Sequence, residues 1–327
     1  MSETLEISAP SASEYAAATD GAALFDRSAL GKLALHGPQA AEFLDSLLSQ
    51  DIAAIPVGSG ADATLLDHKG HMLAEVRVLA TEDELLLDCE RAALQALFDA
   101  LSQFGLGWRA ELHKRTLEVA MLSVVGTRAA SVFADPVPEE EHAHVVGSLD
   151  GVAVRLVRTR LGIDVICAAE ESGRVQAALL AAGATPIAER TYECVRIEAG
   201  IPRYGVELDQ STMPQEAGLH ERAVSFTKGC YVGQETVARL YWKGKPNRHL
   251  RRLALSEPVA PGAALVLGER EVGRLASSAL SPRLGAIGMA IVRREAQPGA
   301  VLAVGDGNAT ATVGRVPAAM DDAEVAG

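Results

Sequence analysis

Apolar and polar positions repeat with two different periods in the first third of the chain. In "GKLALHGPQAAEFLDSLLSQDI", apolar residues alternate as in a strand before Gly37-Pro38, and afterwards they recur at helical spacing. "GADATLLDHKGHMLAEVRVLATEDELLLDCE" contains three alternating runs, which predict three strands with turns at 67–70 and 81–84. "RAALQALFDALSQFG" predicts an amphipathic helix that ends at Gly105.

Strands and helices continue to alternate through the middle of the chain. "LEVAMLSVVG" predicts a strand, and "GVAVRLVRT" and "GIDVICAA" predict a hairpin. "ESGRVQAALLAAGA" predicts a helix that ends at Gly183. "PIAERTYECVRIEAGIPRYGVELD" begins as another helix, which the Gly200–Pro202 segment breaks. This mixture predicts an α+β fold.

The pattern changes after Lys245, where short apolar runs are separated by Gly, Pro and Ser. Such a pattern is typical of a small antiparallel barrel or sandwich. We therefore predict a loose N-terminus over 1–18 and a region of two lobes, which need not be continuous, over 19–245. A β-barrel over 246–317 and a disordered, acidic tail over 318–327 complete the prediction.

Composition favours a globular protein with more than one lobe. The chain has 327 residues, of which 48% are hydrophobic and 22% charged. No apolar run approaches the roughly 20 residues of a membrane span. The polar N-terminus does not resemble a signal peptide, so we expect a cytoplasmic protein. A net charge of −13 disfavours binding to nucleic acid or to an anionic membrane.

Positive charge is nevertheless concentrated in one short segment. The basic residues of this segment are Arg239, Lys243, Lys245, Arg248, Arg251 and Arg252. They form either a solvated edge or a positive rim for an anionic ligand.

Four scattered cysteines form no CxxC or CxxH pair. A disulfide framework and a metal site built from local spacing are therefore both disfavoured, and we predict no bound metal. Cys89, Cys167 and Cys194 are expected in the core, and Cys230 lies in an unusual setting.

The segment "TKGCYVGQETVAR" places Cys230 next to glycine and near a lysine. In an extended chain Lys228 and Cys230 project to the same side, and a nearby ammonium favours the nucleophilic thiolate. Cys230 is therefore a candidate reactive thiol with Lys228 as its activator. The alternative is that Cys230 is a small buried residue, as free cysteines usually are.

Polar residues flank glycines in two further places. Gln234 and Glu235 follow Gly233, and Arg239 lies one helical turn beyond Glu235. These residues form an i,i+4 ion pair or orient a ligand at a helix start. In "RIEAGIPRYGVELD", Glu198 lies just before a break in the chain, where binding residues are common and solvated glutamates are also common.

Together, "KGCYVGQE" and "RIEAGIPRYGVELD" resemble the folate-binding YgfZ family, whose eukaryotic counterparts are mitochondrial iron–sulfur assembly factors. This family is related to the T-protein of the glycine cleavage system, an aminomethyltransferase that uses tetrahydrofolate. The resemblance extends over 22–317. It includes "LHGPQAAEFLDSLLSQDI", "LLDHKGHMLAEVRV" and "GEREVGRLASSALSPRLGAIGMAIVR".

The resemblance implies a three-lobed clover-leaf with a ferredoxin-like central region, a C-terminal antiparallel β-barrel and a central tetrahydrofolate site. Glu198 stands where the superfamily has the glutamate that holds the pteridine, and a carboxylate suits this role because it accepts two parallel hydrogen bonds. Tyr204, Gln234, Glu235 and Arg239 are the other residues expected to bind folate.

Two functions remain open on this resemblance. The first is a folate-binding protein that supports assembly or repair of iron–sulfur enzymes, with those enzymes as its partners. The second is a folate-dependent aminomethyltransferase, which would use Glu75 as its catalytic carboxylate. The T-protein has an aspartate at that position and an acidic, phenylalanine-containing segment in place of 228–231. A misplacement of about 1 Å can cost about a hundredfold in rate, so these departures favour the first function.

Two further points limit these functions. A demethylase or oxidase of the same superfamily would carry a flavin domain, and the chain has no GxGxxG fingerprint. A lone Cys230 cannot hold an iron–sulfur cluster, so the other ligands of any such cluster would come from a partner. Whether the protein turns over a substrate is left open.

Overall fold

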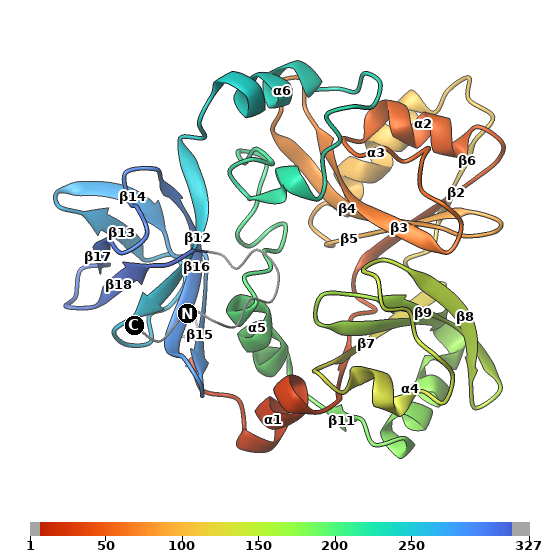
Figure 1. Ribbon diagram of the computed structural model, residues 1–327, viewed down its shortest axis with the longest axis horizontal. Coiled ribbons are helices and arrows are strands. Elements are labelled where there is room, and N and C mark those ends of the chain that lie inside the picture. Colours follow the sequence, from red (N-terminus) through yellow and green to blue (C-terminus); the bar gives the residue numbers. More distant parts are fainter. Residues whose placement is uncertain (1–6, 316–327) are drawn as a thin grey trace.

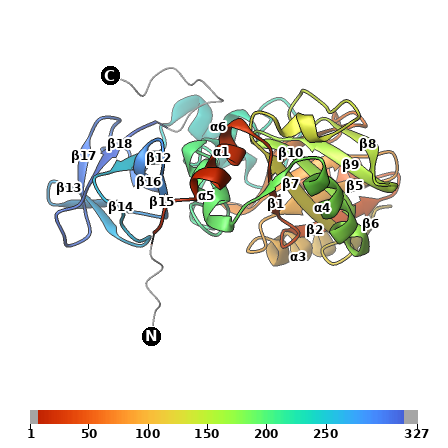
Figure 2. The same ribbon diagram turned by 90° about the horizontal axis from the view of Figure 1, so that it is seen from below.

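Three lobes surround a central helix, α5 (Glu189–Glu198), in the computed structural model of the protein (Figure 1). The structure describes residues 7–315. Two of the lobes contain the first half of the chain, and the third is the C-terminal barrel on the opposite side of α5. Figure 2 shows the same arrangement from below, with α1 (Ala12–Asp20) and α5 between the barrel and the other two lobes.

The first lobe is a five-stranded antiparallel sheet of order β3-β4-β5-β2-β6 with two helices packed on it. Phe43, Leu44 and Leu47 share one face of α2, and Leu97 and Leu101 share one face of α3, so both helices bury an apolar stripe. The elements of this lobe are β2 (Gly31–His36), α2 (Ala40–Leu47), β3 (Ser59–Leu66), β4 (Met72–Ala80), β5 (Leu85–Cys89), α3 (Leu94–Phe104) and β6 (Glu111–Lys114).

The second lobe is a six-stranded sheet of order β11-β1-β7-β10-β9-β8, in which only the short β1–β11 pair is parallel. Helix α4 packs on it through Val175 and Leu179. The elements are β1 (Ala23–Asp26), β7 (Val119–Val125), η1 (Ala129–Val132), β8 (His144–Leu149), β9 (Val152–Arg158), β10 (Gly162–Ala168), η2 (Ala169–Glu171), α4 (Ser172–Ala181) and β11 (Thr185–Pro186).

The third lobe is a closed antiparallel barrel of six strands. The strands run in the order β12-β18-β17-β13-β14-β16, and β16 pairs with β12 to close the ring, while β15 pairs with β16 outside it. The elements are β12 (Arg248–Leu255), β13 (Ala264–Leu267), β14 (Arg270–Arg274), β15 (Ser277–Ser281), β16 (Gly285–Arg293), β17 (Val301–Val304) and β18 (Thr310–Val313). The first strand begins close to the predicted domain boundary.

The segment between α5 and the barrel packs on the first lobe. Tyr204, Leu208, Tyr231 and Val237 join the core of that lobe, although they follow the second lobe in sequence. This segment includes η3 (Leu219–Glu221) and α6 (Gln234–Lys243).

Two glycines bring the β3–β4 turn and the start of α6 into contact. The β3–β4 turn has Gly70 at φ +83°, and a Cβ on Gly70 would lie 3.3 Å from Thr236 and Val237 of α6. Gly233, at φ +81°, approaches the carbonyl of Asp67 so closely that a Cβ would lie 2.5 Å from it. Glycine is needed at both positions for the backbone angle, and at Gly233 for the space as well.

The structure confirms the α+β fold and the antiparallel barrel. The segments predicted as β2, α2, β3, β4, β5, α3, β7, the β9–β10 hairpin, α4 and α5 all form. The N-terminal segment differs from the prediction, since α1 begins within the part expected to be loose. Ser11 caps this helix by accepting a hydrogen bond from the Glu14 N–H at 3.3 Å, and Tyr15 binds α5. The predicted tail over 318–327 lies outside the described residues.

Candidate functional site

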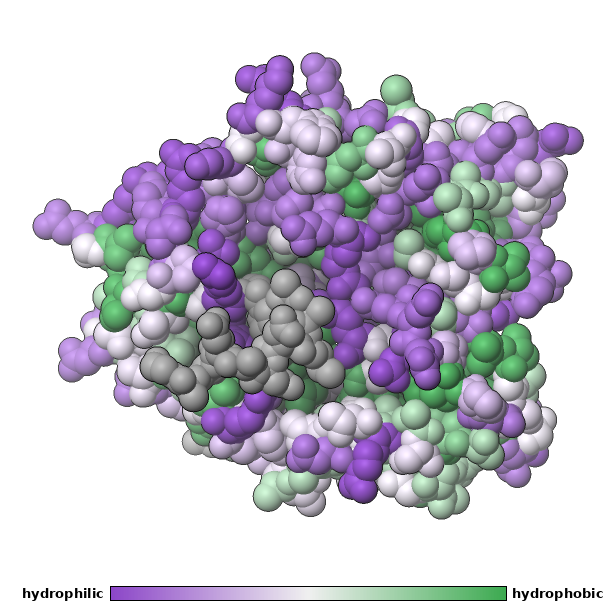
Figure 3. Space-filling model, viewed as in Figure 1, coloured by the Kyte–Doolittle hydropathy of each residue, from purple (hydrophilic) through white to green (hydrophobic). Residues whose placement is uncertain are grey.

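A pocket lies between the first two lobes and α5. Its walls come from β3, β4 and β5, from β7 and β10, from the turn before β10 and from α5 and the chain that follows it. More than half of the residues that line it are polar or charged, and apolar side chains lie between them. The charged residues among them are Arg27, Asp62, Glu75, Arg77, Asp88, Glu90, Glu141, Arg160, Asp164, Arg196, Arg203 and Arg222. On the face drawn in Figure 3, hydrophilic residues gather near the centre of the molecule.

Four of the six arginines in the pocket wall each lie between two carboxylates. Arg77 is 2.8 Å from Asp88 and 2.8 Å from Asp164. Arg203 is 2.9 Å from both Glu90 and Glu193. The other two are Arg196, with Glu193 and Glu207, and Arg222, with Asp62 and Glu141. These pairs hold the lobes and α5 together around the pocket.

Glu75 is the exception among the carboxylates of the pocket. Among residues 7–315 its half-buried carboxyl group has no hydrogen-bond or ion-pair partner. It lies on β4, and its register partner is Thr64 of β3. Burial, with the nearby carboxylate of Asp62, raises the pKa of Glu75 to about 8. At neutral pH the group can therefore both hold and release a proton.

The neighbouring acidic group has a different character. Burial alone would raise the pKa of Asp62, but hydrogen bonding and charge from His142 and Arg222 hold it well below its usual value. Potential ligand atoms of Asp62, Glu141 and His142 lie within 4.8 Å of one another, which is close enough for a metal site. Arg222 already bridges Asp62 and Glu141, so we assign this cluster to the guanidinium rather than to a metal.

The structure places Glu198 at the junction of α5, α1 and the barrel rather than among the residues that line this pocket. Its Oε1 accepts hydrogen bonds from Tyr15 at 2.7 Å, from Cys194 at 3.7 Å and from Ser281. Its Oε2 accepts a bond from Arg283 at 3.2 Å. The carboxylate is 5% exposed, so these partners occupy it inside the protein.

The side chains of Cys230 and Lys228 lie in different environments, since the first is exposed and the second is buried. Cys230 is exposed on the loop before α6, whereas the other three cysteines are buried, as predicted. The Lys228 ammonium is 3.1 Å from the Asp45 carboxylate and donates to the carbonyls of Leu48 and Gln50 at 2.9 Å and to that of Asp45. Among the described residues it makes no hydrogen bond to Cys230, so its bonds serve the end of α2 and not the thiol.

The other residues expected to bind folate also lie outside this pocket wall. Tyr204 is buried in the first lobe, where its hydroxyl donates to the Met72 carbonyl at 3.0 Å. Gln234, Glu235 and Arg239 lie on α6, whose far end carries the exposed Trp242. The structure therefore brings Glu235 and Arg239 onto one helix but gives them no ion pair with each other within the described chain.

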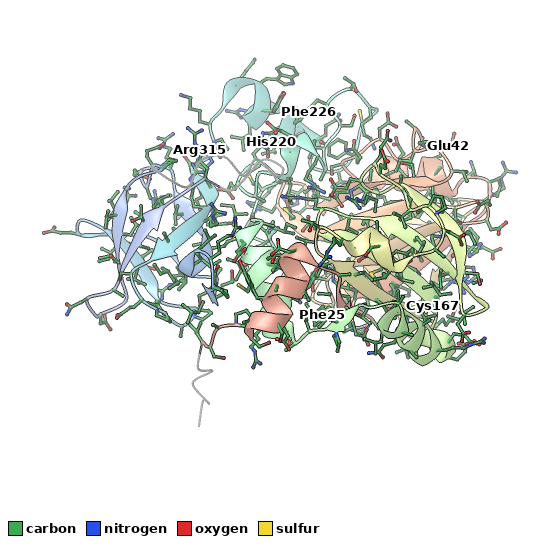
Figure 4. All side chains as sticks on the ribbon, turned by 60° about the horizontal axis from the view of Figure 1, so that its bottom comes forward. Phe25, Glu42, Cys167, His220, Phe226 and Arg315 are labelled. Atoms are coloured by element: carbon green, nitrogen blue, oxygen red, sulfur yellow. The ribbon has the colours of Figure 1, made fainter. Side chains whose placement is uncertain are left out.

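Part of the predicted positive rim is used internally. Arg248 binds the Glu216 carboxylate at 2.7 Å, and Arg252 donates to the Glu198 carbonyl at 2.7 Å. Phe226 stacks on Tyr241 of α6 with ring centroids 3.9 Å apart, and the His220 ring lies 6.0 Å from that of Tyr241; Figure 4 labels Phe226 and His220. Arg239, Lys243 and Lys245 remain exposed on the surface.

Sequence reasoning missed most of the pocket wall. Arg27, Asp62, Arg160 and Arg222 belong to no local motif, and their sequence neighbours give no periodic signal of a site. A sequence-level clue did exist at Arg160, which follows the first strand of a predicted hairpin and therefore lies at a turn. The pairing of the lobes that assembles the wall is not visible in one sequence.

Comparisons with known proteins agree on one family. The model of the GCVT N-terminal domain matches residues 4–228. An aminomethyltransferase of Streptomyces coelicolor is 30% identical over 291 residues, which cover 83% of this chain and 78% of the relative. One from Mycobacterium tuberculosis is 28% identical over 298 residues, which cover 87% and 81%.

A solved structure shares the fold. The glycine cleavage system aminomethyltransferase T from Bartonella henselae superimposes with a TM-score of 0.83 at 23% identity, over 93% of this chain and 87% of that one. Among residues 7–315, no helix has both the length and the apolar character that crossing a membrane requires. Because the domain model covers more than half of its length, the chain belongs to the GCVT family of aminomethyltransferase relatives.

Proposed function

We propose that the protein binds tetrahydrofolate in the pocket between its lobes and handles a one-carbon unit there as an aminomethyltransferase does. The observation that carries this proposal is Glu75, whose carboxyl group lines the pocket, has no partner among residues 7–315 and has a pKa of about 8. The family and the names of its relatives support the same chemistry. They favour aminomethyl transfer over the iron–sulfur function that the sequence motifs favour.

The polar wall suits a folate. A pteridine offers neighbouring N–H donors, which suit a carboxyl acceptor, and the rest of folate is anionic, which suits guanidinium groups. Tetrahydrofolate, when bound, supplies the two nitrogen atoms that carry the one-carbon unit. The wall contains acceptors and guanidinium groups of this kind, and it is held rigid by the four paired arginines.

Glu75 would supply proton transfer. In aminomethyl transfer from a lipoyl-bound donor, the carbon loses its bonds to the amine nitrogen and to the lipoyl sulfur and gains bonds to two nitrogens of tetrahydrofolate. The two protons released by those nitrogens end on the departing ammonia and thiol, so the amine needs a group that delivers a proton to it. Glu75 can donate the proton because burial keeps it protonated at a pH where other carboxyls are ionised. Asp62, held ionised by His142 and Arg222, would stabilise positive charge nearby.

The experiment is aminomethyl transfer from a lipoyl-bound donor to tetrahydrofolate, with folate affinity measured by calorimetry. We expect Glu75→Gln to lower the rate about a hundredfold while tetrahydrofolate still binds. Glu75→Asp, which restores the shorter side chain of the T-protein, should keep part of the activity. The matched control is Glu269→Gln, at an exposed position on the barrel. A wild-type rate in Glu75→Gln would refute the proposed role.

The pteridine contact of Glu198 stays a prediction. A pteridine that used this carboxylate would have to displace Tyr15, Ser281 or Arg283. Calorimetry of Glu198→Ala with tetrahydrofolate tests this contact, and unchanged affinity would remove Glu198 from the site.

A second function is favoured by one specific observation, the exposed thiol of Cys230 within "KGCYVGQE". On this hypothesis the protein binds folate and supports iron–sulfur enzymes, with the thiol in contact with a partner or its cluster. The test is Cys230→Ala in the native host, with the activities of cluster-containing enzymes as the readout. Normal activities, in a host where deletion of the whole gene lowers them, would show that the thiol is dispensable.

A further inference from the structure

Two arginines of the pocket wall lack the carboxylate partners that the other four have. Within residues 7–315, neither Arg27 nor Arg160 has an ion pair with an acidic side chain, although both line the pocket. Withdrawing a charged group from water without a partner costs free energy of folding, so such groups in proteins are usually paired or bind a ligand. These two guanidinium groups therefore require a separate explanation.

Arg27 lies in the connection between β1 and β2. Its guanidinium carbon lies 5.5 Å from the centroid of the Tyr192 ring, on α5. The nearby carboxylates already have partners: Asp164 is bound by Arg77 at 2.8 Å and by Ser123 at 2.5 Å, and Glu90 is bound by Arg203 at 2.9 Å. The stacking on Tyr192 orients the guanidinium and leaves its N–H donors for a ligand.

Arg160 lies at the turn between β9 and β10. Its side chain makes one hydrogen bond, from Nη2 to the Ala199 carbonyl at 3.3 Å, at the end of α5. Burial, and then the like charge of Arg222, lower the pKa of Arg160 below its usual value. Of the nearby carboxyl groups, Asp62 and Glu141 are committed to Arg222, and the pKa of about 8 keeps Glu75 mostly protonated at neutral pH. An anionic ligand would therefore relieve this repulsion.

We propose that the guanidinium groups of Arg27 and Arg160 bind the carboxylate end of the ligand that occupies the pocket. An arginine presents a planar pair of donors that matches a carboxylate, and a partly buried site strengthens that bond. The inference rests on the proposed function for the identity of the ligand. The carboxylate belongs either to the glutamyl tail of folate or to a small amino-acid substrate that reacts beside it.

The experiment measures binding by calorimetry to wild type, Arg27→Gln and Arg160→Gln. The probes are tetrahydrofolate, tetrahydropterin without a tail, 4-aminobenzoylglutamate and glycine. Arg274→Gln is the matched control, because Arg274 is an exposed arginine of the barrel. Thermal unfolding shows whether each variant is folded. If Arg160→Gln does not fold, the binding measurements on Arg160→Lys and Arg27→Gln test the proposal instead.

We expect each variant to bind tetrahydrofolate about tenfold more weakly than wild type and to bind tetrahydropterin with unchanged affinity. Weakened binding of glycine alone would still support the inference and would assign the carboxylate to an amino-acid substrate. Wild-type affinities for every probe in both variants would overturn it. If wild type binds neither tetrahydrofolate nor tetrahydropterin, the proposed function fails. The inference is then decided by 4-aminobenzoylglutamate and glycine, and it is overturned if wild type binds neither.

Discussion

At the scale of single residues, Glu75 stands apart from the other acidic side chains of the pocket because nothing in the described chain neutralises it. Asp88, Glu90 and Asp164 each bind an arginine of the wall. An unpaired carboxyl next to Asp62 resists ionisation, since two negative charges in one buried site repel each other. The same property that would make Glu75 a proton donor therefore costs stability at high pH.

The cost has a defined pH dependence. The pKa of Glu75 rises from an ordinary value of 4.5 to about 8 on folding, so the folded protein holds this proton more tightly than the unfolded chain. The free energy of unfolding therefore falls as pH rises from 4.5 to 8, and the effect is complete above 8. In urea unfolding, the free energy of unfolding of Glu75→Gln relative to that of wild type should rise by roughly 2 kcal/mol as pH rises between these limits. This is less than the full pKa shift would give, because the side chain is only half-buried.

Glu269→Gln is the control, since it removes one carboxyl on the exposed surface of the barrel. A difference between Glu75→Gln and wild type that stays constant from pH 4 to pH 9 would contradict the raised pKa of Glu75.

At the scale of elements, the loop that carries Cys230 is attached to α2 through Lys228. The last carbonyls of a helix lack partners within the helix, and a lysine there satisfies them and interacts favourably with the helix dipole. The Lys228 side chain is 1% exposed and binds this end of α2 together with the Asp45 carboxylate. Lys228 therefore has a structural role that its position in the motif does not reveal.

We expect Lys228→Met to lower the free energy of unfolding by about 2–3 kcal/mol, because buried carbonyls and a carboxylate lose their donor. It should not slow alkylation of Cys230 by iodoacetamide at neutral pH, since the ammonium makes no bond to the thiol. The control is Lys243→Met, on the exposed end of α6. A tenfold slower reaction in Lys228→Met, with Lys243→Met unchanged, would restore Lys228 as the activator of the thiol.

The elements show how far a sequence can be read. Strands and helices with a regular apolar period formed where predicted, because burial of one face depends on local spacing. Helix α1 buries only Ala18 and so has no such stripe. It is held by Tyr15, whose partner Glu198 is 183 residues away. Arg27 and Arg160 were missed for the same reason, since contacts between lobes create the pocket.

At the scale of the whole molecule, Glu198 connects α1, α5 and the barrel. Tyr15 belongs to α1, Ser281 ends β15, and Arg283 follows it in the barrel. Arg252 of β12 adds a bond to the Glu198 carbonyl at 2.7 Å. An apolar cluster on the same side of α5, which includes Ile197, packs on the barrel. The carboxylate is thus the polar centre of the interface that fixes the third lobe.

Removal of this centre should loosen the barrel from the rest of the chain. We expect Glu198→Ala to lower the free energy of unfolding by about 3 kcal/mol, because Arg283, Tyr15 and Ser281 all lose a buried acceptor. Tyr15→Phe, which removes one donor, should cost about 1 kcal/mol. Urea unfolding measures both, and a double variant that costs no more than Glu198→Ala alone shows that the two groups act through one bond. A wild-type midpoint for Glu198→Ala would show that the apolar cluster alone holds the barrel in place.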